Sequence, residues 1–112
     1  EEMGFDYTWA VEHHCLEEFS HCSAPAIPFA AASQRTSTMR FGHGAVLLPQ
    51  PYNHPIRVTE RIGALDILSR GRLDVGFEQS GTRDWARYTA VTVRMVQAAQ
   101  RGHSFRWRVY SD

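Results

Sequence analysis

Short apolar segments alternate with segments of helical spacing along most of the chain. Residues 7–11, 39–48 and 73–77 are rich in β-branched, aromatic and other apolar side chains. We predict a strand in each of them. We expect the first strand to be buried, and the nearly all-apolar end of the second is typical of a strand covered on both faces.

Helical patterns lie between these strands. Residues 23–35 have Ser23 as a candidate N-cap and Pro25 in the first turn. In the next pattern Asn53 is the candidate cap, Pro55 stands near the start, and Arg70-Gly71 closes the helix. Its predicted inward positions follow helical spacing: Val58, Ile62, Leu65 and Ile67 or Leu68.

The remaining segments have weaker patterns. Residues 1–5 are interpreted as the tail of a helix that ends at Gly4. A helix is predicted over residues 84–100, and residues 105–110 alternate like an amphipathic strand. Loops are expected over residues 12–22, 49–52 and 78–83.

This order of elements predicts an α/β fold with parallel strands and crossover helices. Alternation alone does not separate a barrel from a doubly wound sheet. No glycine-rich phosphate-binding motif opens any of the predicted helices.

Composition limits the classes of protein. With 112 residues, 43% of them hydrophobic and 21% charged, the chain is globular and amounts to one domain or part of one. No apolar run reaches the roughly 18 residues of a membrane span, and nothing has the pattern of a secretory signal. Two cysteines are too few for a disulfide framework, so we expect reduced thiols and a cytoplasmic protein with no membrane partner.

Charge is distributed unevenly, although the net charge is zero. Residues 70–112 carry eight Arg and four acidic residues, against four Arg and eight acidic residues before them. A basic half can face phosphate or an acidic partner, but solvated helix faces are the better explanation. Residues 105–110 alternate Arg with aromatic side chains, as some nucleic-acid surfaces do. The absence of Lys and the neutral total favour an ordinary strand, so no nucleic-acid partner is expected.

Candidate chemistry gathers after the predicted strands, where ligands of parallel α/β folds bind. Glu12, His13 and His14 follow the first strand, residues 49–53 the second and residues 78–83 the third. His13 is a candidate general acid or base or a hydrogen-bond donor to a ligand. The alternative is that it only forms a hydrogen bond with the backbone at the start of a loop.

Two further patterns remain open. The ligand types of a zinc site are present in one loop, but their spacing matches no common finger or ribbon: His13, His14, Cys15, His21 and Cys22. Gly42 and Gly44 flank His43 inside a strand, where glycines allow close approach of a ligand or backbone, or make room for bulky neighbours.

Several ordered motifs resemble the luciferase-like flavin-dependent monooxygenases. Gly4-Phe5-Asp6, Trp9 and Glu12-His13-His14 are similar to that family's second strand, and residues 36–49 to its third. The most specific match is residues 54–61, HPIRVTER, continued by residues 65–73, LDILSRGRL. The resemblance spans about residues 1–88.

The resemblance implies a (β/α)8 barrel that oxidises a small organic substrate with reduced FMN, or a deazaflavin, and dioxygen. A flavin reductase would supply the cofactor, and a homo-oligomer is expected. By position, His13 resembles the active-site histidine, and His14 its supporting neighbour. The resemblance places the cofactor beside these residues: Glu12, His43, Gly44, Gly76, Gln79 and Ser80.

The chain departs from the family pattern in two ways. Gln79 stands where relatives carry an Arg that holds the flavin phosphate, and Glu78 adds a negative charge that Arg83 would have to offset. A barrel of this type needs about 250 residues, so we expect a partial barrel with little or no turnover by this segment alone. The alternative function is a non-catalytic flavin-binding or assembly module.

Overall fold

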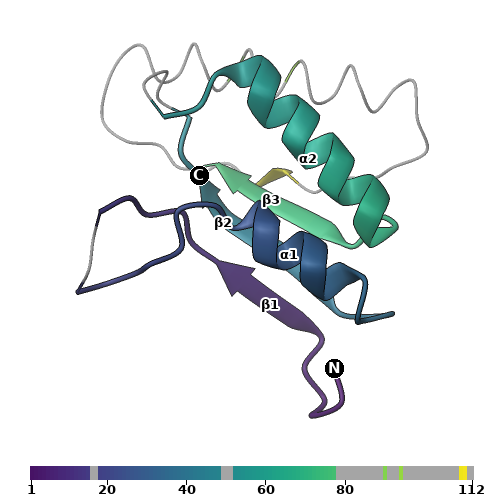
Figure 1. The fold of residues 1–112 in the computed structure, drawn as a ribbon. Coiled ribbons are helices and arrows are strands. Elements are labelled where there is room, and N and C mark those ends of the chain that lie inside the picture. The colour runs from purple at the N-terminus through teal and green to yellow at the C-terminus, as the bar shows by residue number, and fades with distance from the viewer. Residues whose placement is uncertain (16–17, 49–51, 78–89, 91–93, 95–108, 111–112) are drawn as a thin grey trace.

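The computed structural model describes residues 1–15, 18–48, 52–77, 90, 94 and 109–110. Its elements alternate as expected (Figure 1). In chain order they are β1 (Tyr7–Ala10), α1 (Ala26–Ser33), β2 (Arg40–Val46), α2 (Pro55–Ser69), β3 (Leu73–Phe77) and β4 (Val109–Tyr110). The third predicted strand is confirmed at both ends, and the first two are shorter than predicted.

The strands form one parallel sheet in the order β1-β2-β3-β4. Trp9 pairs with Gly42, and Ala10 pairs with His43. The register between β2 and β3 shifts between His43 and Val46, and the Gly44–Ala45 peptide bond in this stretch is cis. Because the strands are parallel, the segments after β1 and β2 emerge at the same edge of the sheet.

Helices α1 and α2 cover one face of the sheet (Figure 1). Phe41 of β2 packs against Phe29 of α1, with ring centroids 5.5 Å apart. The core lies between these layers, and its buried members come from both helices, β2, β3 and the segment after β2: Phe29, Phe41, Val46, Leu48, Val58, Ile62, Leu65, Leu73, Val75 and Phe77.

The inward stripe of α2 is confirmed in its first three turns and differs in the last. Val58, Ile62 and Leu65 are buried as predicted, whereas Ile67 and Leu68 are exposed. The remaining buried positions are Asp66, next to Leu65, and Ser69, four residues after Leu65. A helix repeats its buried face every three or four residues, so the small side chain continues the stripe where a larger one was expected.

Strand β1 is half-exposed, so the prediction of a buried strand was wrong. Trp9 keeps 52% of its surface and Tyr7 46%. These side chains alternate with Thr8 and Ala10, which are partly buried. β1 is an edge strand of the described sheet, and its aromatic side chains lie on the face opposite the helices.

The predicted starts of both helices also need correction. α1 begins at Ala26 with Pro25 as its N-cap and no side-chain cap, so Ser23 does not cap it, and it ends at Ser33. α2 is capped by His54, whose Nδ1 accepts a hydrogen bond from the backbone N–H of Ile56, and not by Asn53. Arg70 and Gly71 end this helix in left-handed conformations, as the prediction required.

The N-terminal segment forms a turn and no helix tail. The backbone N–H of Gly4 donates to the carbonyl oxygen of Glu1 at 2.9 Å. Gly4 has φ of +83°, which accounts for glycine at this position.

Most of the C-terminal predictions lie outside the described residues. Of the predicted helix 84–100, Ala90 and Arg94 are described and are helical. Of the predicted strand 105–110, Val109 and Tyr110 are described and pair with β3. The described part of the chain contains no helix that is long and apolar enough to cross a membrane.

Candidate functional site at the carboxyl ends of β1 and β2

A hollow of about 310 Å³ opens beyond the carboxyl ends of β1 and β2. It is lined by Val11, Glu12, His13, Gly44 and Ala45. The parallel register brings these two segments together although they are more than thirty residues apart. Three of the proposed site residues therefore share a surface: Glu12 and His13 after β1, and Gly44 near the end of β2.

His13 forms the backbone hydrogen bond of the simpler interpretation, and its ligand-binding role stays a prediction. Its backbone N–H donates to the carbonyl oxygen of Cys22 at 3.0 Å, which fixes the start of the loop. Its ring meets that of Phe19 edge to face, with centroids 4.9 Å apart. Since His13 also lines the hollow, its backbone bond leaves the imidazole available to a ligand.

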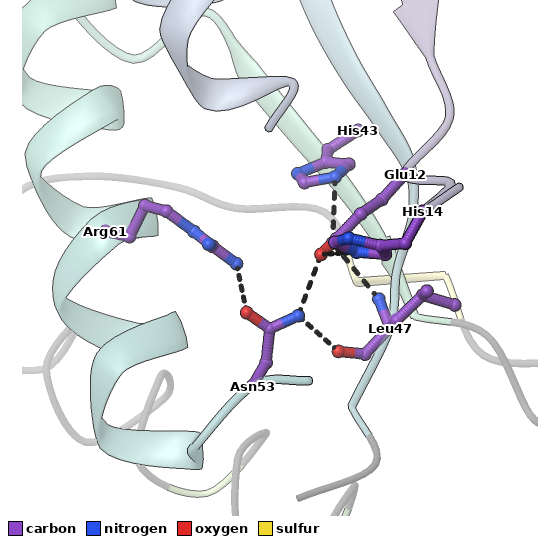
Figure 2. A network of polar contacts seen from close by, with 6 residues as sticks. All are labelled: Glu12, His14, His43, Leu47, Asn53 and Arg61. Atoms are coloured by element: carbon purple, nitrogen blue, oxygen red, sulfur yellow. Dashed lines mark hydrogen bonds and ion pairs between the residues drawn. The ribbon is translucent and has the colours of Figure 1, made fainter. Parts of the chain in front are cut away.

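Beside His13, the carboxylate of Glu12 is the centre of a buried polar network (Figure 2). Only 3% of the residue is exposed. Oε1 accepts from Nδ2 of Asn53 at 2.9 Å and contacts Nε2 of His14 at 3.1 Å. Oε2 accepts from the backbone N–H of Leu47 at 3.3 Å. A buried carboxylate requires such partners, and these ones tie the end of β1 to the segments that follow β2.

Asn53 extends this network to α2. Its Nδ2 donates to the carbonyl oxygen of Leu47 at 2.6 Å as well as to Glu12. Its Oδ1 accepts from Nη2 of Arg61 at 3.0 Å. One amide side chain therefore links two strand ends and a helix.

His43 lies on the helix-covered side of the sheet. Its ring meets that of Phe29 nearly at right angles, and the residue is 3% exposed. Burial lowers its pKa to about 4, against the opposing effect of Glu12, so the imidazole is neutral at pH 7. Nε2 lies 3.6 Å from Oε2 of Glu12, which is beyond hydrogen-bond distance, and has no hydrogen bond among the described residues.

The other described residues of the proposed set lie close to these, on three different segments. His14 turns to Glu12, and its ring lies 5.3 Å from that of Tyr52. Gly44 lines the hollow, whereas Gly76 lies in β3 and pairs with Tyr110. Gln79 and Ser80, with the loop over residues 78–83, lie outside the described residues.

The two glycines of β2 make room for a bulky neighbour. Cβ atoms at Gly42 and Gly44 would both overlap the indole ring of Trp9. This favours the second of the two explanations considered for these glycines.

The five candidate zinc ligands are all described, and they do not converge. Within the described residues no group of three or more His, Cys, Asp or Glu side chains is arranged to hold a metal ion. Both cysteines are free thiols. The zinc alternative therefore has no geometric support.

Sequence reasoning missed the two residues that complete the network. Asn53 was named as a helix cap and as the end of the segment 49–53, and Arg61 only within the motif 54–61, so neither was predicted to join Glu12. The available signal was a polar residue at the end of the segment after the second strand, where a buried partner such as Glu12 is within reach.

Comparison with known proteins agrees with this geometry. The sequence profile of the luciferase-like monooxygenases matches residues 1–101. Limonene 1,2-monooxygenase of Rhodococcus erythropolis is 41% identical over 76 residues, which are 68% of this chain and 19% of that enzyme. The chain spans about a fifth of the length of the curated relatives it matches.

Solved structures share the fold. The monooxygenase RslO1 of Streptomyces bottropensis superimposes with a TM-score of 0.71 and 31% identity, over 86% of this chain and 32% of RslO1. A second structure is the oxygenating constituent of 3,6-diketocamphane monooxygenase of Pseudomonas putida, a type II Baeyer-Villiger enzyme in complex with FMN. It superimposes with a TM-score of 0.64 and 23% identity, over 88% of this chain and 28% of that protein. The second likeness is one of fold.

These findings define the class of protein. The chain belongs to the luciferase-like monooxygenase family, whose members are flavin-type oxidoreductases on a (β/α)8 barrel. The described residues form part of such a barrel, with consecutive parallel strands and crossover helices on one face.

Proposed function

We propose that the protein containing this chain uses reduced flavin and dioxygen to oxidise a small organic substrate, with His13 as a catalytic residue. The observation that carries the proposal is the position of His13 on the hollow at the carboxyl ends of β1 and β2. Active sites of (β/α)8 barrels lie at this end. His13 would donate or accept a proton there, and His14, which contacts Glu12, would support the arrangement.

The hollow is compatible with a flavin ring. Its volume of about 310 Å³ lies at the lower end of the range of ligand pockets. Gly44 and Ala45 present little side-chain bulk to it, and the proposed cofactor-binding set comprises Glu12, His43, Gly44, Gly76, Gln79 and Ser80. When bound, the reduced cofactor supplies the electrons that activate dioxygen. We propose reduced FMN and keep a deazaflavin as the alternative, because proteins that share the fold include the camphane enzyme with FMN and a coenzyme F420-dependent reductase of Methanopyrus kandleri.

The chain's own groups contribute placement and exclusion of water. Glu12 holds the segment that carries His13, and Val11 gives the hollow an apolar wall. An apolar wall keeps water from a reactive site.

Further proposed partners are a flavin reductase and a second copy of the chain. The proposed location is the cytoplasm, where free thiols such as Cys15 and Cys22 persist.

The matched test compares His13→Gln with His21→Gln, an exposed histidine outside the hollow. Reduced FMN is mixed with oxygenated buffer and each full-length protein, and flavin binding and the rate of flavin oxidation are followed by fluorescence and absorbance. We expect His13→Gln to change the oxidation rate by about 100-fold or more with little change in affinity, while His21→Gln matches the wild type. Equal rates for the two variants would remove His13 from the mechanism.

A non-catalytic flavin-binding or assembly module is the second candidate. Gln79 favours it, since this residue stands where the resemblance expects the Arg that holds the flavin phosphate. Tight FMN binding in which the protein leaves flavin oxidation at its rate in free solution would favour this module over the enzyme.

A further inference from the structure

Asn53 occupies the junction of three segments next to the proposed site. The residue is 8% exposed, and its side chain forms three hydrogen bonds, to Glu12, Leu47 and Arg61. Figure 2 shows the amide between the guanidinium of Arg61 and the carboxylate of Glu12. A buried amide with both donors and its oxygen engaged has one orientation that satisfies all of its partners.

The network controls the backbone that carries His13. Glu12 directly precedes His13, and its carboxylate is held by Asn53 on one oxygen and by the backbone of Leu47 on the other. On the other side, the backbone N–H of His13 is bound to Cys22. His13 thus leaves β1 with the chain fixed just before it and at its own N–H.

We infer that Asn53 is a positioning residue that holds His13 at the hollow through Glu12, which rests on the proposed function above. Asn53 is not among the residues that line the hollow, which argues against direct contact with a ligand there. Its role is to supply two N–H donors that join an anionic side chain of one strand end to a carbonyl of the next. An error of about 1 Å in the placement of a reacting group costs up to about 100-fold in rate.

The substitution Asn53→Asp tests this role with almost no change of shape. It replaces the donor NH₂ with an oxygen that faces Oε1 of Glu12 and the carbonyl oxygen of Leu47. All three oxygens are hydrogen-bond acceptors, so both hydrogen bonds are lost. Two carboxylates this close hold one proton between them, and uptake of that proton restores a hydrogen bond. The groups facing the pair are His14 and His43 beside Glu12 and Arg61 beside residue 53. Arg61 favours the charged form and lowers the pH at which the proton is taken up.

The first measurement is the rate of reduced FMN oxidation by the full-length protein between about pH 5 and about pH 8. Relative to wild type at the same pH, we expect Asn53→Asp to lose about 10- to 100-fold at the alkaline end and to recover as the pH falls. Asn53→Ala should show the loss without the recovery. Arg57→Gln is the matched control, because Arg57 is on the same helix as Arg61 but exposed and paired with Glu60.

The second measurement needs no cofactor. Amide hydrogen exchange at Leu47 and His13 should accelerate at least about tenfold in Asn53→Ala and in alkaline Asn53→Asp, and stay unchanged in Arg57→Gln. A wild-type protein inactive toward reduced FMN would overturn the proposed function, while exchange would still decide whether Asn53 fixes His13. An equal loss for Asn53→Asp at every pH, or exchange at His13 equal to wild type in both Asn53 variants, would overturn the positioning role.

Discussion

The indole ring of Trp9 lies directly over Gly42 of the neighbouring strand. The two residues are register partners, and the ring also reaches Gly44, where an added Cβ would lie 2.8 Å from Cε3. The indole ring therefore packs against the backbone of both glycines. Trp9 in turn covers the strand next to the proposed site.

We therefore predict that Gly42→Ala destabilises the protein by about 1–3 kcal/mol, because the new methyl group overlaps the ring and displaces it. Urea unfolding and the NMR signals of the Trp9 ring measure the two effects. In a Trp9→Ala background the cost should disappear, since the overlap is then gone. Gly63→Ala is the control, because nothing lies within 4 Å of a Cβ there and the helix should gain about 1 kcal/mol. An equal cost of Gly42→Ala with and without Trp9 would contradict this explanation.

Arg72 joins three elements through hydrogen bonds of its guanidinium. The acceptors are at the end of α1, before β2 and at the end of α2: the carbonyl oxygens of Ser33, Thr36, Met39 and Ser69 and the hydroxyl of Thr36. A lysine has three donors on one atom and cannot reach this spread of acceptors. We predict that Arg72→Lys lowers the free energy of unfolding by about 2 kcal/mol or more.

The control for Arg72 is Arg70→Lys, at an exposed position two residues earlier. It should change stability by less than about 0.5 kcal/mol. Chemical denaturation of both variants gives the comparison, and similar midpoints would show that charge alone matters at Arg72.

Stability should fall on acidification because of His43. Its pKa is lowered by burial from 6.5 to about 4, so between these values the unfolded chain binds a proton that the native protein excludes. The neutral His43 therefore costs no stability above pH 6.5. As the pH falls from 6.5 toward 4, the free energy of unfolding decreases by up to about 3 kcal/mol in total. Unfolding free energies of wild type and His43→Gln measured across this range should converge at low pH. A parallel decline in both would assign the pH dependence to other groups.

Glu1 provides a second acid-sensitive contact at the opposite end of β2. Its carboxylate accepts hydrogen bonds from the backbone N–H groups of Ser37, Thr38 and Met39 and from the Ser37 hydroxyl. These bonds lower its pKa from 4.5 to about 2. The stabilisation is therefore present above pH 4.5 and lost as the pH falls toward 2. Glu1→Gln should be less stable than Glu2→Gln at pH 7, and thermal unfolding should show this difference shrinking at acid pH.

Local pattern was sufficient for the elements whose own side chains determine them. The spacing of Val58, Ile62 and Leu65 predicted α2 and its buried face, and the alternation of Leu73, Val75 and Phe77 predicted β3. The alternation of the two kinds of segment predicted parallel pairing, since a strand followed by a helix must cross back over the sheet. The position of His13 beyond the end of β1 follows from the same reasoning.

Other features depended on neighbours that are distant in the sequence. The period of two along β2 assigns His43 and Gly42 to opposite faces, but only the placement of α1 shows that His43 lies on the covered one. Asn53 has the properties of a helix cap, yet its amide donates to the buried carboxylate of Glu12, which is 41 residues away. His54 caps α2 instead. The sequence by itself therefore determined the elements, their alternation and the parallel direction of the strands, because these follow from local periodicity. Only the tertiary structure decided which polar groups meet at the strand ends, because a buried charge is stabilised by whichever donors the folded chain brings to it.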